Sequence, residues 1–224
     1  MTVTPQETFW DGITNSSNLS PDEARIRHLV ADSAKQGNWP GLLSILTKDP
    51  SIVNATRPDG KALYSPLHYA AYGGAPTQTI RDLLKLGAFR TLRDAQGNRP
   101  VDIAHNRQHK HLLSILDPVF EHRVRPDELT RIQQNFHQVI LGRASELIAE
   151  DHMRLPELEN VLEFVSARFW FAVPGMYGGF AYWIVSDGPA AKLMVESWSR
   201  ACEGSGQRHE ITESGSRLVE EGFV

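Results

Sequence analysis

The feature that most constrains this chain of 224 residues is a pattern that returns at a nearly constant spacing. Residues 65–74 read SPLHYAAYGG and precede an amphipathic run at 80–86. Ala70 has a counterpart 34 residues later in Ala104, and an upstream counterpart of residues 71–74 lies 37 residues earlier. Further apolar runs occupy 42–46 and 112–116. A fixed period of this length predicts stacked pairs of helices, each burying an apolar face against its neighbour.

The middle segment resembles an ankyrin repeat, whose consensus carries T-P-L-H-x-A-A-x-x-G and a later Gly-Ala pair. Ser65 stands where that family usually has Thr, and Gly87-Ala88 supplies the pair. The resemblance covers roughly residues 25–117. It implies three repeats that bind another protein and catalyse nothing. Pro66 and Pro100 suit the first turn of a helix, and we interpret His68 as a structural hydrogen-bonding group.

Composition excludes several classes of protein. The net charge of −4 argues against a nucleic-acid binder, which usually carries a basic face. No apolar run reaches the length of a membrane span, and the first residues lack the features of a signal peptide. The single cysteine, Cys202, fits a reducing compartment. We therefore expect a bacterial cytoplasmic protein without a membrane or nucleic-acid partner.

The repeat domain is predicted to span residues 20–117. Ser20 and Glu23 form a capping-box signature around Pro21, which predicts a helix that runs to about Lys35. Residues 1–19 are rich in Thr, Ser and Asn and are predicted to be an irregular arm. Apolar side chains of this arm are expected to pin it to the first repeat: Phe9, Trp10 and Ile13.

After a linker at 118–126, residues 127–224 read as a small α+β domain. Apolar residues at helical spacing predict a helix over 127–150 with a break near Gly142. Five strand candidates separated by glycine-rich turns follow, and such short connections predict an antiparallel meander. This part resembles a C-terminal module of bacterial ankyrin-repeat proteins, which implies no known activity. The predicted fold is an α-solenoid of three ankyrin repeats followed by an α+β domain with an antiparallel meander sheet.

Three chemical interpretations were weighed against simpler ones. Cys202, His209 and Glu210 offer a nucleophile, a base and an orienting acid, but no second motif of a cysteine hydrolase accompanies them. The glycines at 204–206 lack the phosphate-loop pattern and are better explained by a hairpin turn. Two of the histidines at 105, 109 and 111 have zinc-like spacing, yet a solvated helix face explains them. We expect no catalytic residue, no metal and no cofactor.

The expected binding surface of the repeats lies on the exposed helix positions and hairpin tips. Tyr69 and Tyr72 are the predicted anchors, because buried Tyr and Arg side chains tend to dominate interface energies. The full set of predicted contact residues in the repeats is Asp32, Lys35, Gln36, Arg57, Lys61, Tyr69, Tyr72, Arg90, Arg93, Asn98, Asn106 and Arg107.

A second contact surface is predicted where two glycine-rich turns of the α+β domain meet. Turns that join alternate strands of a meander fall at the same end of the sheet. The residues brought together there are predicted to contact an acidic or anionic partner surface: Tyr177, Arg200, Ser205, Gln207 and Arg208. A competing interpretation pairs Arg200 with Glu196 or Glu210 inside the sheet.

The resulting hypothesis is a protein–protein interaction protein. Its leading form is a bacterial immunity or adaptor protein that binds and neutralises a toxin or enzyme partner. The alternative is an enzyme with hydrolase-like chemistry in the C-terminal domain, targeted by the ankyrin part.

Overall fold

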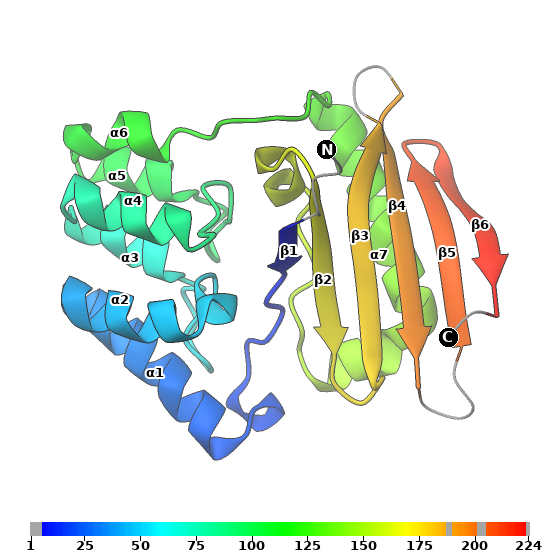
Figure 1. The fold of residues 1–224 in the computed structure, drawn as a ribbon, viewed down its shortest axis with the longest axis horizontal. Helices are drawn as coiled ribbons and strands as arrows, with labels where there is room; N and C mark the ends of the chain where they lie inside the picture. Colours follow the sequence, from blue (N-terminus) through cyan, green and yellow to red (C-terminus); the bar gives the residue numbers. More distant parts are fainter. Residues whose placement is uncertain (1–5, 187–189, 201–204, 223–224) are drawn as a thin grey trace. The chain divides into compact units, whose positions relative to one another are not determined.

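The computed structural model describes residues 6–186, 190–200 and 205–222. The chain divides into two compact units (Figure 1). The helical unit is Ile13–Val119. The sheet unit combines the first residues, up to Gly12, with everything from Phe120 onward.

The helical unit is built from three consecutive pairs of α-helices, with one short 3-10 turn before the first helix and another after the second. The helices are α1 (Pro21–Lys35), α2 (Trp39–Lys48), α3 (Pro66–Gly73), α4 (Thr77–Lys85), α5 (Pro100–Asn106) and α6 (Lys110–Leu116). The turns are η1 (Ser16–Asn18) and η2 (Pro50–Ile52). Helices α1 and α5 both pack against α3, which therefore lies in the middle of the row.

Local signals explain where these helices begin. The Ser20 hydroxyl and the Glu23 backbone form the predicted capping box at the start of α1. In α3 the backbone N–H of Ser65 donates to Nδ1 of the fully buried His68, at 3.2 Å. His68 is therefore part of the helix cap. Gly74 ends α3 in the left-handed conformation that glycine adopts without strain.

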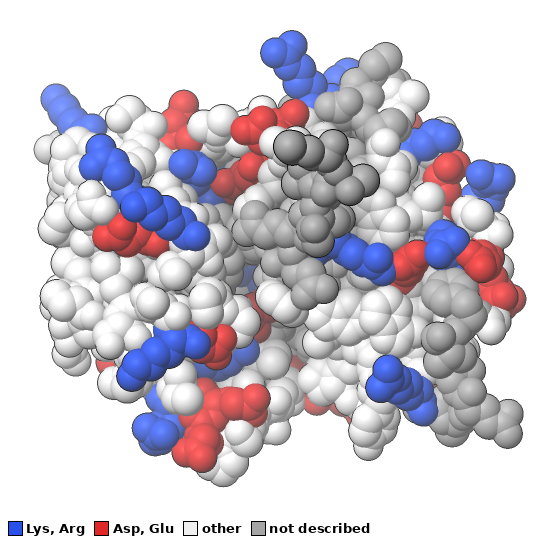
Figure 2. Space-filling model, in the orientation of Figure 1, with Lys and Arg blue, Asp and Glu red and all other residues white. Residues whose placement is uncertain are grey.

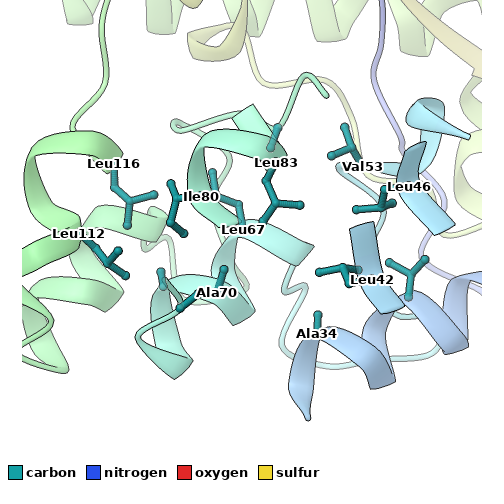
Figure 3. Close-up of a cluster of buried hydrophobic side chains, with 14 of the residues drawn as sticks. Ala34, Leu42, Leu46, Val53, Leu67, Ala70, Ile80, Leu83, Leu112 and Leu116 are labelled. Carbon is teal, nitrogen blue, oxygen red and sulfur yellow. The ribbon is translucent and has the colours of Figure 1, made fainter. Parts of the chain in front are cut away.

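One continuous apolar core joins the three helix pairs (Figure 3). Small residues lie where helices approach closely, and Ala70 and Ala104 are both completely buried. Branched aliphatic side chains fill the space between pairs, and the fully buried ones include Leu42, Leu46, Leu67, Ile80, Leu83, Leu112 and Leu116. Each such side chain contributes roughly 1.5–3 kcal/mol through burial.

The sheet unit has one long helix on one face of a six-stranded sheet (Figure 1). Its elements are β1 (Gln6–Phe9), α7 (Pro126–Glu150), η3 (Glu159–Glu163), β2 (Ala167–Val173), β3 (Gly178–Ser186), β4 (Lys192–Ser199), β5 (Ser205–Thr212) and β6 (Gly215–Glu221). The strands lie side by side in chain order. Strand β1 is parallel to β2, and every other pair is antiparallel.

Aromatic side chains hold α7 on the sheet. Phe136 of α7 lies 4.9 Å from the ring of Tyr182, and Tyr182 lies 5.4 Å from Phe169, measured between ring centroids. All three are completely buried. The helix is interrupted at Ala144, whose φ of −144° is not helical. The predicted break near Gly142 is thus present two residues later.

The predicted fold class is wrong. The helix pairs are not copies of one repeat, because the first helix has 15 residues and the fifth has 7, so they do not form the regular three-repeat ankyrin solenoid that the sequence suggested. The sheet is mixed and not an antiparallel meander, because β1 joins it in parallel. The physical reason is that only the middle segment carries the repeat consensus.

The predicted irregular arm is also wrong for residues 6–9. Gln6–Phe9 form a strand of the sheet unit, and Trp10 continues its pairing through a 2.9 Å hydrogen bond to the Trp170 carbonyl. The indole N–H of the buried Trp10 donates to the carbonyl of Arg154 at 3.0 Å. Trp10 therefore belongs to the sheet unit, and the first helix pair does not hold it.

No helix among the described residues is both long enough and apolar enough to cross a membrane.

Candidate interaction surfaces

An aromatic cluster lies at the middle of the helical unit. Tyr64 contacts Tyr69 edge to face, at 5.2 Å between centroids, and Tyr72 at 6.3 Å. The guanidinium of Arg107 lies 4.3 Å from the centroid of the Tyr72 ring. We call Tyr64, Tyr69, Tyr72 and Arg107 the tyrosine face. Tyr72 is 46% exposed, so this large aromatic side chain is presented to solvent although it belongs to a packed helix.

A charged pair borders the tyrosine face. Arg57 and Asp32 form an ion pair with both side chains partly exposed. Burial raises the pKa of the Tyr69 hydroxyl, while the positive charge of Arg57 lowers it and the negative charge of Asp32 raises it. The pair therefore lies within electrostatic range of Tyr69. The structure thus brings together five predicted contact residues: Asp32, Arg57, Tyr69, Tyr72 and Arg107.

Other predicted contact residues of the helical unit have different positions. Lys35, Gln36, Lys61 and Asn106 are exposed. Three others make hydrogen bonds within the unit. Arg90 Nε donates to the Ile115 carbonyl at 3.0 Å, an arginine nitrogen of Arg93 donates to the Gly97 carbonyl at 2.8 Å, and the Asn98 amide donates to Asp94 at 3.1 Å. These last three side chains hold loops and helix ends, a role that the sequence analysis did not assign to them.

Gly178 and Ser205, the described residues that begin β3 and β5 beside the two glycine-rich segments, lie at the same end of the sheet, as predicted. Gly179 is opposite Trp198, and Ser199 is opposite Ser205. The Ser199 hydroxyl donates to the Met176 carbonyl at 2.9 Å. This bond joins the end of β4 to the turn between β2 and β3. Tyr177 is 75% exposed and takes a left-handed φ of 51° at the turn.

The predicted residues at this end divide between the two faces of the sheet. Neighbours along a strand point to opposite faces. Gln207 is on the α7 side and donates to Glu221 at 2.7 Å. Arg208 is on the other side, where it pairs with Glu196 at 2.7 Å and also with Glu220. The predicted contact surface is therefore divided, with Gln207 on one face of the sheet and Arg208 on the other. Arg200 is exposed.

An open pocket lies on the α7 side of this end, with a volume of about 450 Å³. We call it the sheet-end pocket. Its lining comes from α7, from the turn after β2 and from the ends of β4, β5 and β6: Arg143, Leu147, Gly175, Met176, Ser199, Ser205, Gln207 and Glu221. The sequence analysis identified Ser205 and Gln207 but missed Arg143. The signal for it was weak, a polar residue beside the glycine that marked the break in the helix.

The outer sheet face, opposite α7, carries a ladder of paired charges. Glu196 accepts hydrogen bonds from both Arg168 and Arg208, and Arg208 also reaches Glu220. In the next row Glu210 pairs with Lys192 and Arg217, at 3.4 and 3.3 Å. Figure 2 shows these basic and acidic groups alternating over strands β2 to β6.

Two of the three candidate catalytic residues lie on opposite faces of one strand. Cys202 and Gly204 lie outside the described residues. His209 and Glu210 are neighbours on β5 and so point to opposite faces. Glu210 is committed to Lys192 and Arg217, whose hydrogen bonds lower the pKa of its carboxyl. Glu210 therefore does not orient His209.

The histidines near the end of the helical unit bond to backbone carbonyls. His109 Nε2 lies 3.1 Å from the Tyr72 carbonyl oxygen, and His111 Nε2 lies 3.3 Å from that of Ala75. No cluster of His, Cys, Asp or Glu suited to a metal ion occurs within the described ranges.

Comparisons with known proteins leave the family open. No protein-family model matches the chain. Oxysterol-binding protein-related protein 1 of Rattus norvegicus is 30% identical over 92 residues, which is 41% of this chain and only 9% of that protein. The chain is also similar to a solved structure described as Bd0816 predatory endopeptidase from Bdellovibrio bacteriovorus in complex with immunity protein Bd3460. That likeness has a TM-score of 0.35 and 21% identity, over 54% of this chain and 65% of the matched chain.

Proposed function

We propose that this chain is a protein–protein interaction protein that binds its partner through the tyrosine face. In its specific form, the proposal is an immunity or adaptor protein that holds a toxin or enzyme partner inactive. The observation that carries the proposal is the clustering of Tyr64, Tyr69, Tyr72 and Arg107. Tyr and Arg are the residue types that most often dominate the energy of protein interfaces.

The tyrosine face has the physical properties of a binding site. Tyr side chains offer a large contact area at a small cost in conformational entropy, and each hydroxyl can bond to a partner. Tyr72 presents 46% of its surface, although full burial of a large aromatic ring is favourable. Covering the ring with a partner would recover that free energy.

The charge around the tyrosine face favours an acidic partner. Arg107 forms no ion pair within the part of the chain that the structure describes. A partner carboxylate over Tyr72 would pair with a guanidinium that already lies against the aromatic ring. Desolvated pairs of this kind contribute more than pairs at an exposed rim.

The proposal includes no catalytic step and places the protein in the cytoplasm. Membership of the ankyrin family stays a prediction that rests on residues 65–74. If binding alone is the function, Cys202→Ala and His209→Ala should leave the cellular phenotype unaltered in folded protein. Loss of the phenotype with partner binding retained would instead favour an enzyme.

Affinity capture with three forms of the protein tests the proposal. The wild type should retain one stoichiometric protein partner from the native cell, identified by mass spectrometry. Tyr69→Ala/Tyr72→Ala should lose it. The control Leu218→Ala/Val219→Ala removes exposed apolar surface from β6, where the two side chains are 46% and 47% exposed, and should keep it. Capture by the tyrosine variant, or loss by the control, would contradict the proposal.

A further inference from the structure

Arg143 differs from the other arginines of the sheet unit. Six of them form ion pairs with carboxylates: Arg125, Arg131, Arg154, Arg168, Arg208 and Arg217. Arg143 is partly buried, yet its hydrogen bonds go to one residue, the carbonyl and hydroxyl oxygens of Ser205, at 3.1 and 2.9 Å. No carboxylate among the described residues forms an ion pair with it.

This arrangement leaves N–H donors of the Arg143 guanidinium without a hydrogen bond to the protein, although the side chain is partly shielded from water. Only one nitrogen of the guanidinium makes the two bonds to Ser205, and a guanidinium has five N–H groups. Burial lowers the pKa of Arg143, which shows that its charge is partly desolvated. A partly buried charge that forms no direct ion pair is costly, and a ligand carboxylate would offset that cost through a two-point hydrogen bond.

The backbone beside Arg143 is also unusual. Ala144 leaves the helical conformation and interrupts α7 at the next residue. Irregular backbone at such a point costs free energy and is found most often at functional sites. Here the interruption lies next to the one residue of α7 that lines the pocket with a positive charge.

The remaining lining restricts the chemistry of the ligand. Glu221 contributes a negative charge to the same pocket and lies within electrostatic range of Arg143. Burial and the charge of Arg143 both lower the pKa of His209, so this neighbouring ring stays neutral near pH 7 and adds no positive charge. Repulsion from Glu221 is stronger for a doubly charged phosphate than for a carboxylate. A singly charged ligand is therefore favoured.

The apolar part of the lining selects between two kinds of carboxylate. Leu147 and the buried Met176 line the pocket with Arg143. The last residue of a chain carries its carboxylate and its side chain on the same carbon, so both groups fit one compact pocket. An internal Asp or Glu ends in its carboxylate and has no apolar group to place there.

We propose that the sheet-end pocket binds the free C-terminal carboxylate of a peptide or protein whose last residue is apolar. The ligand carboxylate forms an ion pair with Arg143 and accepts a hydrogen bond from the hydroxyl of the adjacent Ser205. The apolar side chain contacts Leu147 and Met176, and Gln207 bonds to the peptide backbone. This site belongs to the sheet unit and does not depend on the tyrosine face.

Nuclear magnetic resonance on the full chain tests this site with defined probes. The arginine Nε–H resonance of Arg143 is followed during titration with N-acetyl-Ala-Leu, which has a free carboxylate, and with its C-terminal amide. The acid should move this resonance in a saturable way with a dissociation constant in the millimolar range. The amide should not. Equal shifts with both probes, or no shift with either, would overturn the proposal without the need for a variant.

Two further arms identify the source of the carboxylate and the residue that binds it. An internal acid, N-acetyl-Ala-Asp-amide, should bind more weakly than N-acetyl-Ala-Leu, and equal or tighter binding would overturn the choice of a chain terminus. Arg143→Gln, followed through the backbone amide of Ser205, should weaken binding at least ~tenfold, since hydrogen bonds to charged groups are individually strong.

The matched control is Arg217→Gln, which removes an exposed arginine from the outer face of the same sheet. It should bind N-acetyl-Ala-Leu like the wild type. If Arg143→Gln does not fold, Arg143→Lys keeps the charge but loses the planar fork, and it should still bind several-fold more weakly. Wild-type affinity in a folded Arg143 variant, or loss of binding in the control, would contradict the assignment.

Discussion

Arg107 and Arg168 each lie over an aromatic ring, at 4.3 Å from Tyr72 in the helical unit and 4.8 Å from Trp183 in the sheet unit. Arg168 is also paired with Glu196, which is paired in turn with Arg208. Arg107 has no such acid among the described residues. The arginine that lies over a ring on the sheet is thus already paired with an acid, whereas the arginine that lies over a ring in the helical unit is not.

We therefore expect the two surfaces to have different roles. On the outer sheet face every charge in the two rows described above has a partner inside the sheet, so the face gains little by meeting another protein. On the tyrosine face a cation and an aromatic ring both remain available. The comparison teaches that the number of charged groups on a surface says less about binding than whether those groups are already paired.

The largest expected effect tests whether the outer sheet face is packed for stability. Trp170 is stacked on Trp198, with ring centroids 4.6 Å apart, above Gly179. A Cβ atom at Gly179 would overlap the Phe171 carbonyl and the Trp170 ring. Gly179→Val should therefore lower the free energy of unfolding by about 3 kcal/mol, measured by urea denaturation.

Gly142→Ala is the matched control for that variant. A Cβ at Gly142 meets no atom within 4 Å, and alanine favours a helix. The control should keep or raise the free energy of unfolding. Equal stability of Gly179→Val and the wild type would show that the face is not packed as described.

A smaller effect on the free energy of unfolding distinguishes the ion pairs of the two surfaces. Glu196 holds two guanidinium groups and its side chain is 12% exposed, whereas Asp32 holds one and is 45% exposed. Glu196→Gln should cost about 1–2 kcal/mol of unfolding free energy. Asp32→Asn should cost under about 0.5 kcal/mol. Equal costs for the two variants in thermal or urea denaturation would remove the distinction between the surfaces.

The smallest effect is a dependence of stability on pH in the sheet unit. Burial lowers the pKa of both His137 and His209. The unfolded chain therefore binds more protons than the folded one below the ordinary histidine pKa of about 6.5, and stability falls as the pH drops through that value.

Replacing His137 tests this dependence. Its Nε2 lies 2.8 Å from the Pro156 carbonyl oxygen, and glutamine keeps a donor there. His137→Gln should reduce the loss of stability between about pH 7.5 and about pH 5.5. An unchanged loss in denaturation curves at the two pH values would assign the dependence to other groups.

Local signals in the sequence were sufficient for parts of the fold. Ser20 and Glu23 predicted the start of α1, and the helix ends at Lys35 as expected. The five strand candidates overlap β2 to β6, because alternation and glycine turns are local features. Strand β1 was missed because its four residues have no distinctive pattern and pair with residues 167–170, far along the chain.

In the candidate sites, too, the sequence predicts what depends on local pattern and misses what depends on contacts between distant segments. Tyr72 and Arg107 were predicted as exposed inner-helix positions of the ankyrin alignment, and the structure places them in contact. The division between Gln207 and Arg208 was predictable, since Ile211 is buried on the α7 side and alternation from it assigns Gln207 to that side and Arg208 to the other. Arg143 was not predictable, because α7 and β5 meet only in the folded sheet unit.

The most direct test of the central claim is the affinity of the captured partner for Tyr69→Ala/Tyr72→Ala, measured by isothermal titration calorimetry beside the wild type and Leu218→Ala/Val219→Ala. The account predicts a loss of at least ~2 kcal/mol of binding free energy for the tyrosine variant, with its fold intact by circular dichroism, and no loss for the β6 variant. Wild-type affinity in the folded tyrosine variant would contradict the claim that the tyrosine face is the binding site.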